Sequence, residues 1–280
     1  MQEIHLGVFF IMEKRIKEIL ALSPSDEIVR AEGWVRTKRD SKNVSFIEIN
    51  DGSCLKGLQA VIDRSAIPAE LIDSITTGAS VIAEGTIVES EGGAQATELR
   101  CTKLELVGAC PADYPLQKKR HTVEFLREKA YLRPRTNLFG AVTRVRNTMA
   151  YAVHSFFQEN GFVYVNTPLI SASDCEGAGA QFQVTTLDIE NPPRTEDGKV
   201  DYSKDFFGKL ANLTVSGQLE GETYALAMKN IYTFGPTFRA ENSNTTRHLA
   251  EFWMIEPEMA FCTLEGDMDT AEKFLKYIFK

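Results

Sequence analysis

Cationic and carboxylate side chains gather in one short stretch late in the sequence. Residues 238–252 have the sequence FRAENSNTTRHLAEF, in which Arg239, Arg247 and His248 surround a polar link between two apolar segments. Such apolar segments around a polar link are typical of two strands joined as a hairpin. Because the whole chain has a formal net charge of −8, cations concentrated at a hairpin tip indicate a local anionic ligand.

One face of this hairpin is expected to carry an arginine and carboxylates, although the strand pair looks like part of a protein interior. Alternate residues of a strand share a face, so Arg239 and Glu241 lie together before the link. Carboxylates buried without partners are costly, and the pattern therefore predicts either a bound ligand or a ladder of ion pairs on a solvated face. After the link, the charged face is predicted to hold Phe252, Met254, Glu256 and Glu258, and the opposite, ordinary core face Trp253, Ile255, Met259 and Phe261.

The composition is that of a soluble globular protein with room for one large domain or two ordinary ones. The chain has 280 residues, of which 43% are apolar and 25% charged. No apolar run reaches the roughly 18 residues of a membrane span, and the beginning of the chain lacks the features of a signal peptide. Met12 is an alternative start. Five scattered cysteines predict reduced thiols in the cytoplasm, with neither a disulfide framework nor a zinc site.

The first half of the chain is predicted to form a small barrel. Short segments with strand character follow one another, and turn residues separate them. Five strands with one helix between them are typical of a closed Greek-key barrel of the OB type, although another five-stranded barrel has a similar pattern. Trp34 is expected to lie in its core. The predicted strands are 27–37, 44–52, 57–63, 79–88 and 96–108, and the helix is 64–75.

A basic connector is predicted to follow the barrel. From Lys118 to Arg135 the sequence has seven Lys or Arg residues against two Glu, and prolines flank the stretch 111–135. Two interpretations stay open, a solvated linker helix and a hinge that contacts phosphates.

The second half is predicted to be α+β. A helical stripe of apolar residues covers 140–160, and a polar, exposed insertion covers 188–205. The chain ends inside an amphipathic segment, so we expect it to stop within a domain. The predicted strands are 162–170, 213–219, 224–241 and 251–261, and the last helix is 263–280.

Several motifs in order resemble one enzyme family. FRAENSNTTRHLAEF resembles motif 2 of class II aminoacyl-tRNA synthetases of the aspartyl, asparaginyl and lysyl subclass, and EFWMIEPEMAF looks like its asparaginyl version. NGFVYVNTPLISASDCEGAGAQF is similar to motif 1 with the loop after it. FFGKLANLTVSGQLEGE resembles the segment that receives the amino acid, and FIEINDG matches the N-terminal anticodon-binding domain. The resemblance covers nearly the whole chain after about residue 12.

This resemblance implies a domain order and a missing part. We expect an N-terminal extension and helix (1–22), an OB-fold anticodon-binding domain (23–110), a basic hinge (111–135) and a class II catalytic domain (136–280). The glycine-rich motif 3 of the family, with its phosphate-binding arginine, does not occur in the sequence and is expected beyond Lys280. The 1–280 chain alone is therefore expected to form no adenylate.

The activity implied is activation of asparagine by ATP and its transfer to tRNA(Asn). This chemistry needs in-line positioning and cations against the charge that develops at phosphorus. By resemblance, Arg239 grips the α-phosphate and the substrate carboxylate, Arg247 and His248 meet the β- and γ-phosphates, and Phe252 stacks on adenine. Glu241 accepts from the adenine amino group or joins the network of Arg247. Glu258 is similar to the family's acidic ligand for Mg²⁺.

The resemblance also assigns the amino acid and anticodon sites. Glu176 binds the α-ammonium, with a loop cap as its alternative role, and Gln218 reaches the α-amino group or the side-chain amide. Glu256 contacts the side-chain amide, which makes asparagine the preferred substrate over aspartate. On the barrel, Phe46 stacks on an anticodon base and Gln59 contacts its edge. Arg36 and Arg39 are expected to hold phosphates.

The resemblance also implies an assembly, and some alternative functions stay open. The motif 1 helix implies a homodimer, and nothing implies a membrane partner. Three alternatives stay open: an aspartyl or non-discriminating relative, a non-catalytic binding module, and a paralogue that makes an amide without tRNA. The hairpin residues disfavour the second alternative, and the barrel residues Phe46 and Gln59 disfavour the third.

Overall fold

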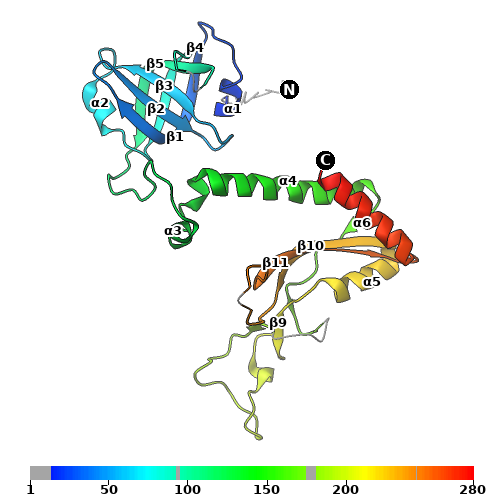
Figure 1. Cartoon of the computed structure of the whole chain (residues 1–280). Coiled ribbons are helices and arrows are strands. Elements are labelled where there is room, and N and C mark those ends of the chain that lie inside the picture. The colour runs from blue at the N-terminus through cyan, green and yellow to red at the C-terminus, as the bar shows by residue number, and fades with distance from the viewer. Residues whose placement is uncertain (1–13, 93–94, 175–180, 244) are drawn as a thin grey trace, which may run out of the picture. The chain divides into compact units, whose positions relative to one another are not determined.

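A computed structural model describes residues 14–92, 95–174, 181–243 and 245–280 of the chain. The described chain forms two compact units, Met1–Val145 and Arg146–Lys280, shown as ribbons in Figure 1. Within the described residues, no helix combines the length and the apolarity of a membrane span. The described cysteines, Cys54, Cys101, Cys110 and Cys262, are free thiols.

The first unit contains the closed five-stranded barrel expected from the sequence, which is therefore confirmed. Its strands pair in the order β1-β2-β3-β5-β4, and only β3 and β5 run parallel. The short helix α1 (Ile16–Ile19) precedes the barrel, and α2 (Ala69–Ser74) lies between β3 and β4. The strands are β1 (Ile28–Asp40), β2 (Val44–Asn50), β3 (Leu58–Asp63), β4 (Ser80–Glu89) and β5 (Thr97–Gly108).

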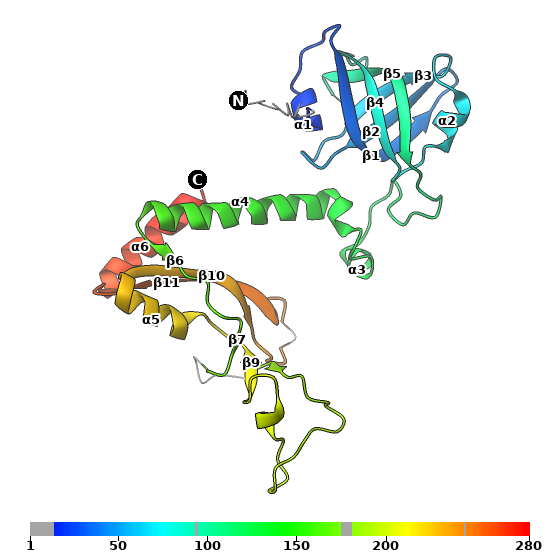
Figure 2. The ribbon, with the colours of Figure 1, turned by 180° about the vertical axis from the view of Figure 1, so that it is seen from behind.

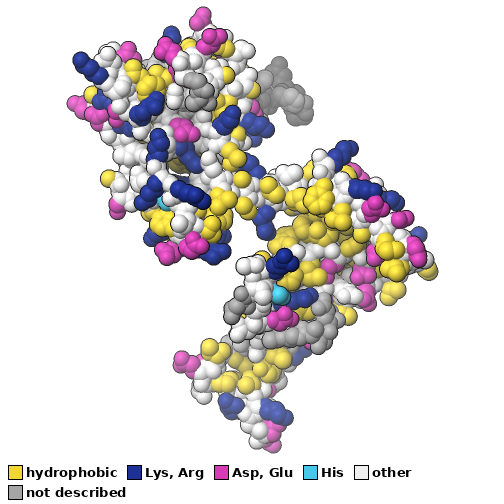
Figure 3. Space-filling model, viewed as in Figure 1, with side chains coloured by type: hydrophobic (Ala, Val, Ile, Leu, Met, Phe, Trp, Pro, Cys, Tyr) yellow, Lys and Arg dark blue, Asp and Glu magenta, His cyan; other side chains and the backbone are white. Residues whose placement is uncertain are grey.

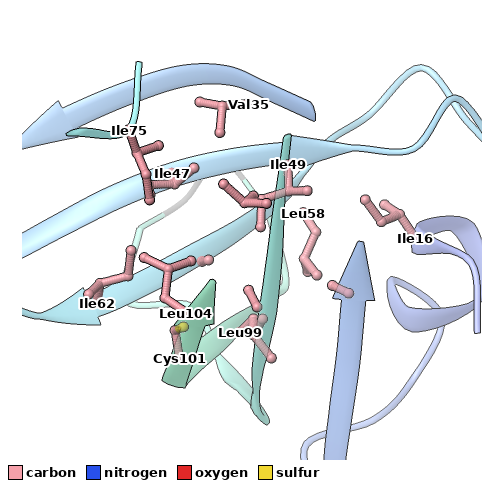
Figure 4. Packing of buried hydrophobic residues seen from close by; sticks show 14 of the residues in the cluster. Ile16, Val35, Ile47, Ile49, Leu58, Ile62, Ile75, Leu99, Cys101 and Leu104 are labelled. Atoms are coloured by element: carbon pink, nitrogen blue, oxygen red, sulfur yellow. The ribbon is translucent and has the colours of Figure 1, made fainter. Parts of the chain in front are cut away.

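Alternation along the strands builds the barrel core. In β2 every second residue is buried, and Ile47 and Ile49 point inward while Phe46 and Glu48 between them stay half-buried. Figure 4 shows such side chains meeting inside the barrel. Large aliphatic side chains that lose all contact with water contribute roughly 1.5–3 kcal/mol each. Fully buried members include Ile47, Ile49, Leu58, Ile62, Ile72 and Leu99.

The prediction that Trp34 is a core residue is wrong. Its side chain is 46% exposed, whereas that of its neighbour Val35 is 1% exposed. Successive residues of a strand point to opposite faces, and Val35 has the inward position. Trp34 therefore lies on the outside of the barrel, where its ring centre is 5.9 Å from the guanidinium carbon of Arg135.

The connector after the barrel is largely irregular but is attached to it. It contains α3 (Val123–Glu128), whose N-terminus is capped by the Thr122 hydroxyl, and the 3-10 turn η1 (Arg133–Arg135). The Arg36 guanidinium donates to the backbone oxygen of Arg135 and, at 2.9 Å, to Oδ1 of Asn137. The long helix α4 (Asn137–Glu159) begins directly after these contacts.

The second unit is built on a mixed sheet in the order β11-β10-β6. Strands β10 (Asn230–Phe238) and β11 (Glu251–Met259) form the predicted hairpin, and β6 (Val163–Tyr164) pairs with β10 in parallel. A smaller sheet has the order β7-β9-β8, formed by β7 (Ile170–Ser171), β8 (Gln183–Val184) and β9 (Ala211–Leu213). The insertion before β9 contains the short 3-10 turn η2 (Tyr202–Lys204).

Helices cover both faces of the β10–β11 pair. Figure 2 shows α4 and α6 (Leu264–Ile278) on one side and α5 (Gln218–Met228) on the other. Phe157 of α4 stacks on Tyr232 of β10 with ring centres 4.7 Å apart. Phe274 of α6 packs against the same cluster. Helix α5 covers the opposite face of the hairpin.

Two further expectations for this unit are wrong. Residues 218–228 form helix α5, although 218–219 and 224–228 were predicted to belong to strands. A short apolar run such as this has no periodicity that distinguishes a helix from a strand. The face expected to be an ordinary core face is partly open, since Trp253 is 49% and Phe261 98% exposed. Met259 does pack against the α4–α6 cluster.

Candidate active site and anticodon face

The hairpin brings Arg239, the predicted α-phosphate residue, next to Phe252, the predicted adenine residue. In the β10–β11 register Thr237 lies opposite Phe252, and the backbone N–H of Arg239 extends the ladder by donating to Ala250 at 3.0 Å. The Arg239 guanidinium carbon lies 5.6 Å from the ring centre of Phe252. Both side chains are half-buried. A planar cation and an aromatic face therefore lie at one end of the strand pair.

The tip of the hairpin is exposed and polar. The side chains of Glu241, Arg247 and His248 are all exposed to solvent. The Thr245 hydroxyl contacts Nδ1 of His248 and accepts from the backbone N–H of Arg247 at 3.4 Å. The tip thus carries a cation and a titratable imidazole at adjacent positions, eight and nine residues after Arg239 in the sequence.

Glu256 is held by three donors at the beginning of α5. Its Oε2 accepts from the Thr233 hydroxyl at 2.8 Å and from the Gly217 backbone N–H at 3.2 Å, and its Oε1 accepts from the Ser216 hydroxyl. A carboxylate at a helix N-terminus is also stabilised by the helix dipole. Sequence reasoning singled out Glu256 but missed Ser216 and Thr233, which look like ordinary strand residues.

Gln218 and Glu258 both interact with Glu222 of α5. Nε2 of Gln218 donates to Oε1 of Glu222 at 3.1 Å. Burial raises the pKa of Glu258, and the neighbouring carboxylates of Glu222, Glu256 and Asp267 raise it further. Like charges so close together favour a bound cation. Among the described residues, no group of three or more His, Cys, Asp or Glu side chains is arranged to hold a metal.

The remaining predicted amino acid ligand is not described. Glu176 falls in 175–180, outside the described residues. Its role therefore stays a prediction from the motif.

The outer face of the barrel brings together three predicted anticodon residues. Arg39 lies opposite Phe46 in the β1–β2 register, with its guanidinium carbon 4.6 Å from the Phe46 ring centre. Gln59 of β3 lies opposite Glu48, two positions along the β2–β3 register from Phe46, and its Nε2 donates to Oε2 of Glu98 at 3.0 Å. Arg36 is not part of this group, because its guanidinium bonds the connector.

A cleft of about 910 Å³ separates the connector from the barrel within the first unit. The guanidinium carbon of Arg135 lies 5.9 Å from the ring centre of Trp34 and 5.8 Å from that of Tyr114. Figure 3 shows Lys and Arg side chains around this part of the unit. The density of basic residues after position 117 signals this cleft, but Trp34 does not stand out in the sequence. The cations that line it are Arg36, Lys118, Lys119, Arg120, Arg135 and Arg144.

Two family models match the chain. The model described as "tRNA synthetases class II (D, K and N)" covers residues 122–280. The model described as "OB-fold nucleic acid binding domain" covers residues 29–107, which is the barrel.

Individual relatives agree with these matches. The chain is 60% identical over 270 residues to an asparagine–tRNA ligase of Synechocystis sp., covering 96% of this chain and 58% of the relative. It is 64% identical over 253 residues to that of Acetivibrio thermocellus, covering 90% of this chain and 54% of the relative. The chain thus spans somewhat less than 60% of the length of these curated relatives.

Solved structures show the same architecture. Asparaginyl-tRNA synthetase from Pyrococcus horikoshii, complexed with asparaginyl-adenylate, superposes with a TM-score of 0.80 at 26% identity. The superposition covers 96% of this chain and 57% of that one. The asparaginyl-tRNA synthetase of Entamoeba histolytica, at 20% identity and a TM-score of 0.77, shares the fold over 96% of this chain and 58% of its own.

Proposed function

The chain belongs to the class II tRNA synthetases of the D, K and N group, and from this premise we propose that the full-length protein activates asparagine with ATP and transfers it to tRNA(Asn). One observation carries the proposal most directly. The hairpin register puts Arg239 beside Phe252 at one end of the strand pair and the held carboxylate of Glu256 further along the same face. A nucleotide and an amino acid can therefore lie side by side on one sheet.

The ATP end of the site uses the hairpin. We assign adenine stacking to Phe252 and the α-phosphate to Arg239, whose planar fork can grip two oxygens at once. Arg247 and His248 at the exposed tip are assigned to the β- and γ-phosphates. Glu241, also at the tip, is assigned to the adenine amino group or to Arg247. These cations would stabilise charge that develops as the asparagine carboxylate attacks phosphorus.

The amino acid end uses the beginning of α5. Glu256 is assigned to the side-chain amide of asparagine, Gln218 to the α-amino group or that amide, and Glu176 to the α-ammonium. A carboxylate accepts an amide N–H and repels a second carboxylate. The environment of Glu256 therefore supports asparagine over aspartate as substrate.

A magnesium ion brought by ATP would fit next to Glu258. The acidic neighbours that raise the pKa of Glu258 favour a cation there. Mg²⁺ is commonly held by one or two carboxylates together with substrate phosphates; Glu258 would supply one such carboxylate, and the ion would help to neutralise the charge of the phosphates.

The barrel is proposed to bind the anticodon. Phe46 supplies a stacking surface, Gln59 contacts a base edge, and Arg39 meets a phosphate. We assign the phosphate contact first to Arg39, because Arg36 already bonds the connector; a phosphate role for Arg36 requires that bond to open. We also propose that the basic cleft beside Arg135 contacts the RNA backbone. Of the two interpretations of residues 111–135, this proposal adopts the hinge that contacts phosphates rather than the solvated linker helix.

Assembly and location are proposed from the same premise. Helix α4 has exposed apolar side chains, with Val145 62% and Tyr151 74% exposed. We assign this helix to a homodimer interface. The free thiols agree with a cytoplasmic protein.

Exchange of pyrophosphate into ATP tests the proposal. The full-length gene product should catalyse exchange that depends on Mg²⁺ and is stimulated by asparagine much more than by aspartate. Charging of tRNA(Asn) with labelled asparagine should follow. Equal stimulation by aspartate, or none by either amino acid, would refute the proposal.

A further inference from the structure

Two buried hydroxyls point at one carboxylate in the second unit. Thr233 and Ser216 are 3% and 1% exposed, and both donate to Glu256. Thr233 reaches it because the hairpin register places the two residues directly opposite each other. Ser216 reaches it from the turn before α5, 40 residues away in the sequence.

Ser216 also connects Glu256 to the first residue of α5. Its hydroxyl accepts from the backbone N–H of Gln218 at 3.0 Å while it donates to Glu256. Between them, Gly217 brings its own backbone N–H to the carboxylate. A Cβ atom on Gly217 would lie 3.0 Å from the Thr233 hydroxyl and 2.8 Å from that of Thr167. The close approach therefore requires glycine.

We propose that Thr233 and Ser216 are positioning residues that orient Glu256 so that the site accepts an amide and rejects a carboxylate. The inference rests on the proposed function, which assigns Glu256 to the substrate side chain. A carboxylate offers about four acceptor positions. Three are occupied by the hydroxyls of Thr233 and Ser216 and by the Gly217 N–H. The remaining position can take one N–H from a substrate amide, whereas a substrate carboxylate has no proton to offer.

A purely structural role for the same contacts makes a different prediction. If the hydroxyls only attach α5 to β10, their loss lowers stability and slows activation of asparagine and aspartate equally. If they orient Glu256, their loss changes the ratio between the two substrates. This ratio is therefore the decisive measurement.

The test compares Thr233→Val with Thr233→Ser in the full-length gene product. Valine keeps the shape but removes the hydroxyl, so kcat/KM for asparagine in pyrophosphate exchange should fall about ten-fold to one hundred-fold, as expected for a lost hydrogen bond to a charge. The asparagine-to-aspartate ratio should fall with it, and KM for ATP should stay unchanged. Serine keeps the donor and should restore both values.

Thr237→Val is the matched control. Thr237 is also buried in β10, at 2% exposed, but its hydroxyl donates to the backbone oxygen of Phe252 rather than to Glu256. It should leave the asparagine-to-aspartate ratio at the wild-type value. Ser216→Ala is the second variant, should Thr233→Val not fold, and it should lower the ratio in the same direction.

The outcomes separate the two proposals. A wild-type protein without exchange that depends on asparagine overturns the proposed function, and this inference with it. An active wild type whose ratio is unchanged in Thr233→Val or Ser216→Ala overturns the positioning role alone. An equal fall of the ratio in Thr237→Val also overturns it.

Discussion

The guanidinium carbon of Arg239 lies 5.6 Å from the centre of the Phe252 ring. The two residues are 13 positions apart, and the antiparallel pairing of β10 with β11 brings them together. A cation over an aromatic ring contributes roughly 0.5–2 kcal/mol. The contact fixes Phe252 as one wall of the proposed adenine site and Arg239 as the cation next to it.

Replacing Phe252 by leucine should weaken ATP binding. Loss of the aromatic face removes stacking worth about 1–3 kcal/mol, so KM for ATP in pyrophosphate exchange should rise at least five-fold. KM for asparagine should change little. Trp253→Leu is the control, because Trp253 is 49% exposed and lies on the opposite face of β11. An equal rise in both variants would remove Phe252 from the site.

Replacing Glu256 by glutamine should abolish most activation of asparagine. The amide N–H₂ would face the donors Thr233 and Ser216, which leaves buried polar groups unpaired. We expect a loss of about 2–4 kcal/mol in kcat/KM for asparagine, with little change in ATP affinity. An unaltered kcat/KM would exclude Glu256 from substrate contact.

Replacing Phe46 by alanine should separate RNA binding from adenylate formation. The barrel is a unit with its own core, and the loss of one stacking face should weaken binding of an asparagine-tRNA anticodon stem-loop by about 1–3 kcal/mol. Exchange of pyrophosphate without tRNA should be unaffected. Ile28→Ala, at an apolar position of β1 that is 68% exposed, should leave RNA binding intact. Loss of exchange together with binding would mean that Phe46 is structural.

The insertion before β9 should be sensitive to acid through Asp205. The Thr185 hydroxyl first, and then the Thr186 backbone N–H, hold the pKa of Asp205 at about 2, below the ordinary value of 3.8. Because the folded-state pKa is lowered, this stabilisation is present above about pH 4 and is lost as the pH falls towards 2.

Hydrogen exchange measures this effect at the backbone amides that donate hydrogen bonds to the Asp205 carboxylate. Asp205→Asn should speed exchange of the Thr186 and Phe206 amides at neutral pH. The difference from wild type should shrink between about pH 4 and pH 2. Asp188→Asn, in the same insertion but bonded to the Glu190 amide, should leave these two amides unchanged. A difference that grows on acidification would contradict the assignment.

The sequence by itself determined the barrel and the chemical character of the site. Alternating residues such as those of β2 predict a strand because one face must leave water and the other must not. Five such segments predicted the closed barrel. The cations Arg239 and Arg247 also indicated an anionic ligand, because charge is a property of single residues. The adenine role of Phe252 came only from the family resemblance.

Only the tertiary structure decided which residues hold the site in place. Helix α5 has no pattern that distinguishes it from a strand, and packing on Ile231 and Thr233 through Gly221 determines its position. Trp34 lies outside the barrel because Val35 has the inward position. Both residues are apolar, so the direction in which β1 faces the core decided this, and hydrophobicity did not. The hydroxyls of Ser216 and Thr233 meet Glu256 only when the chain folds, because they lie 40 and 23 residues before it in the sequence. Such contacts depend on strand register and on the position of α5, which local sequence does not encode.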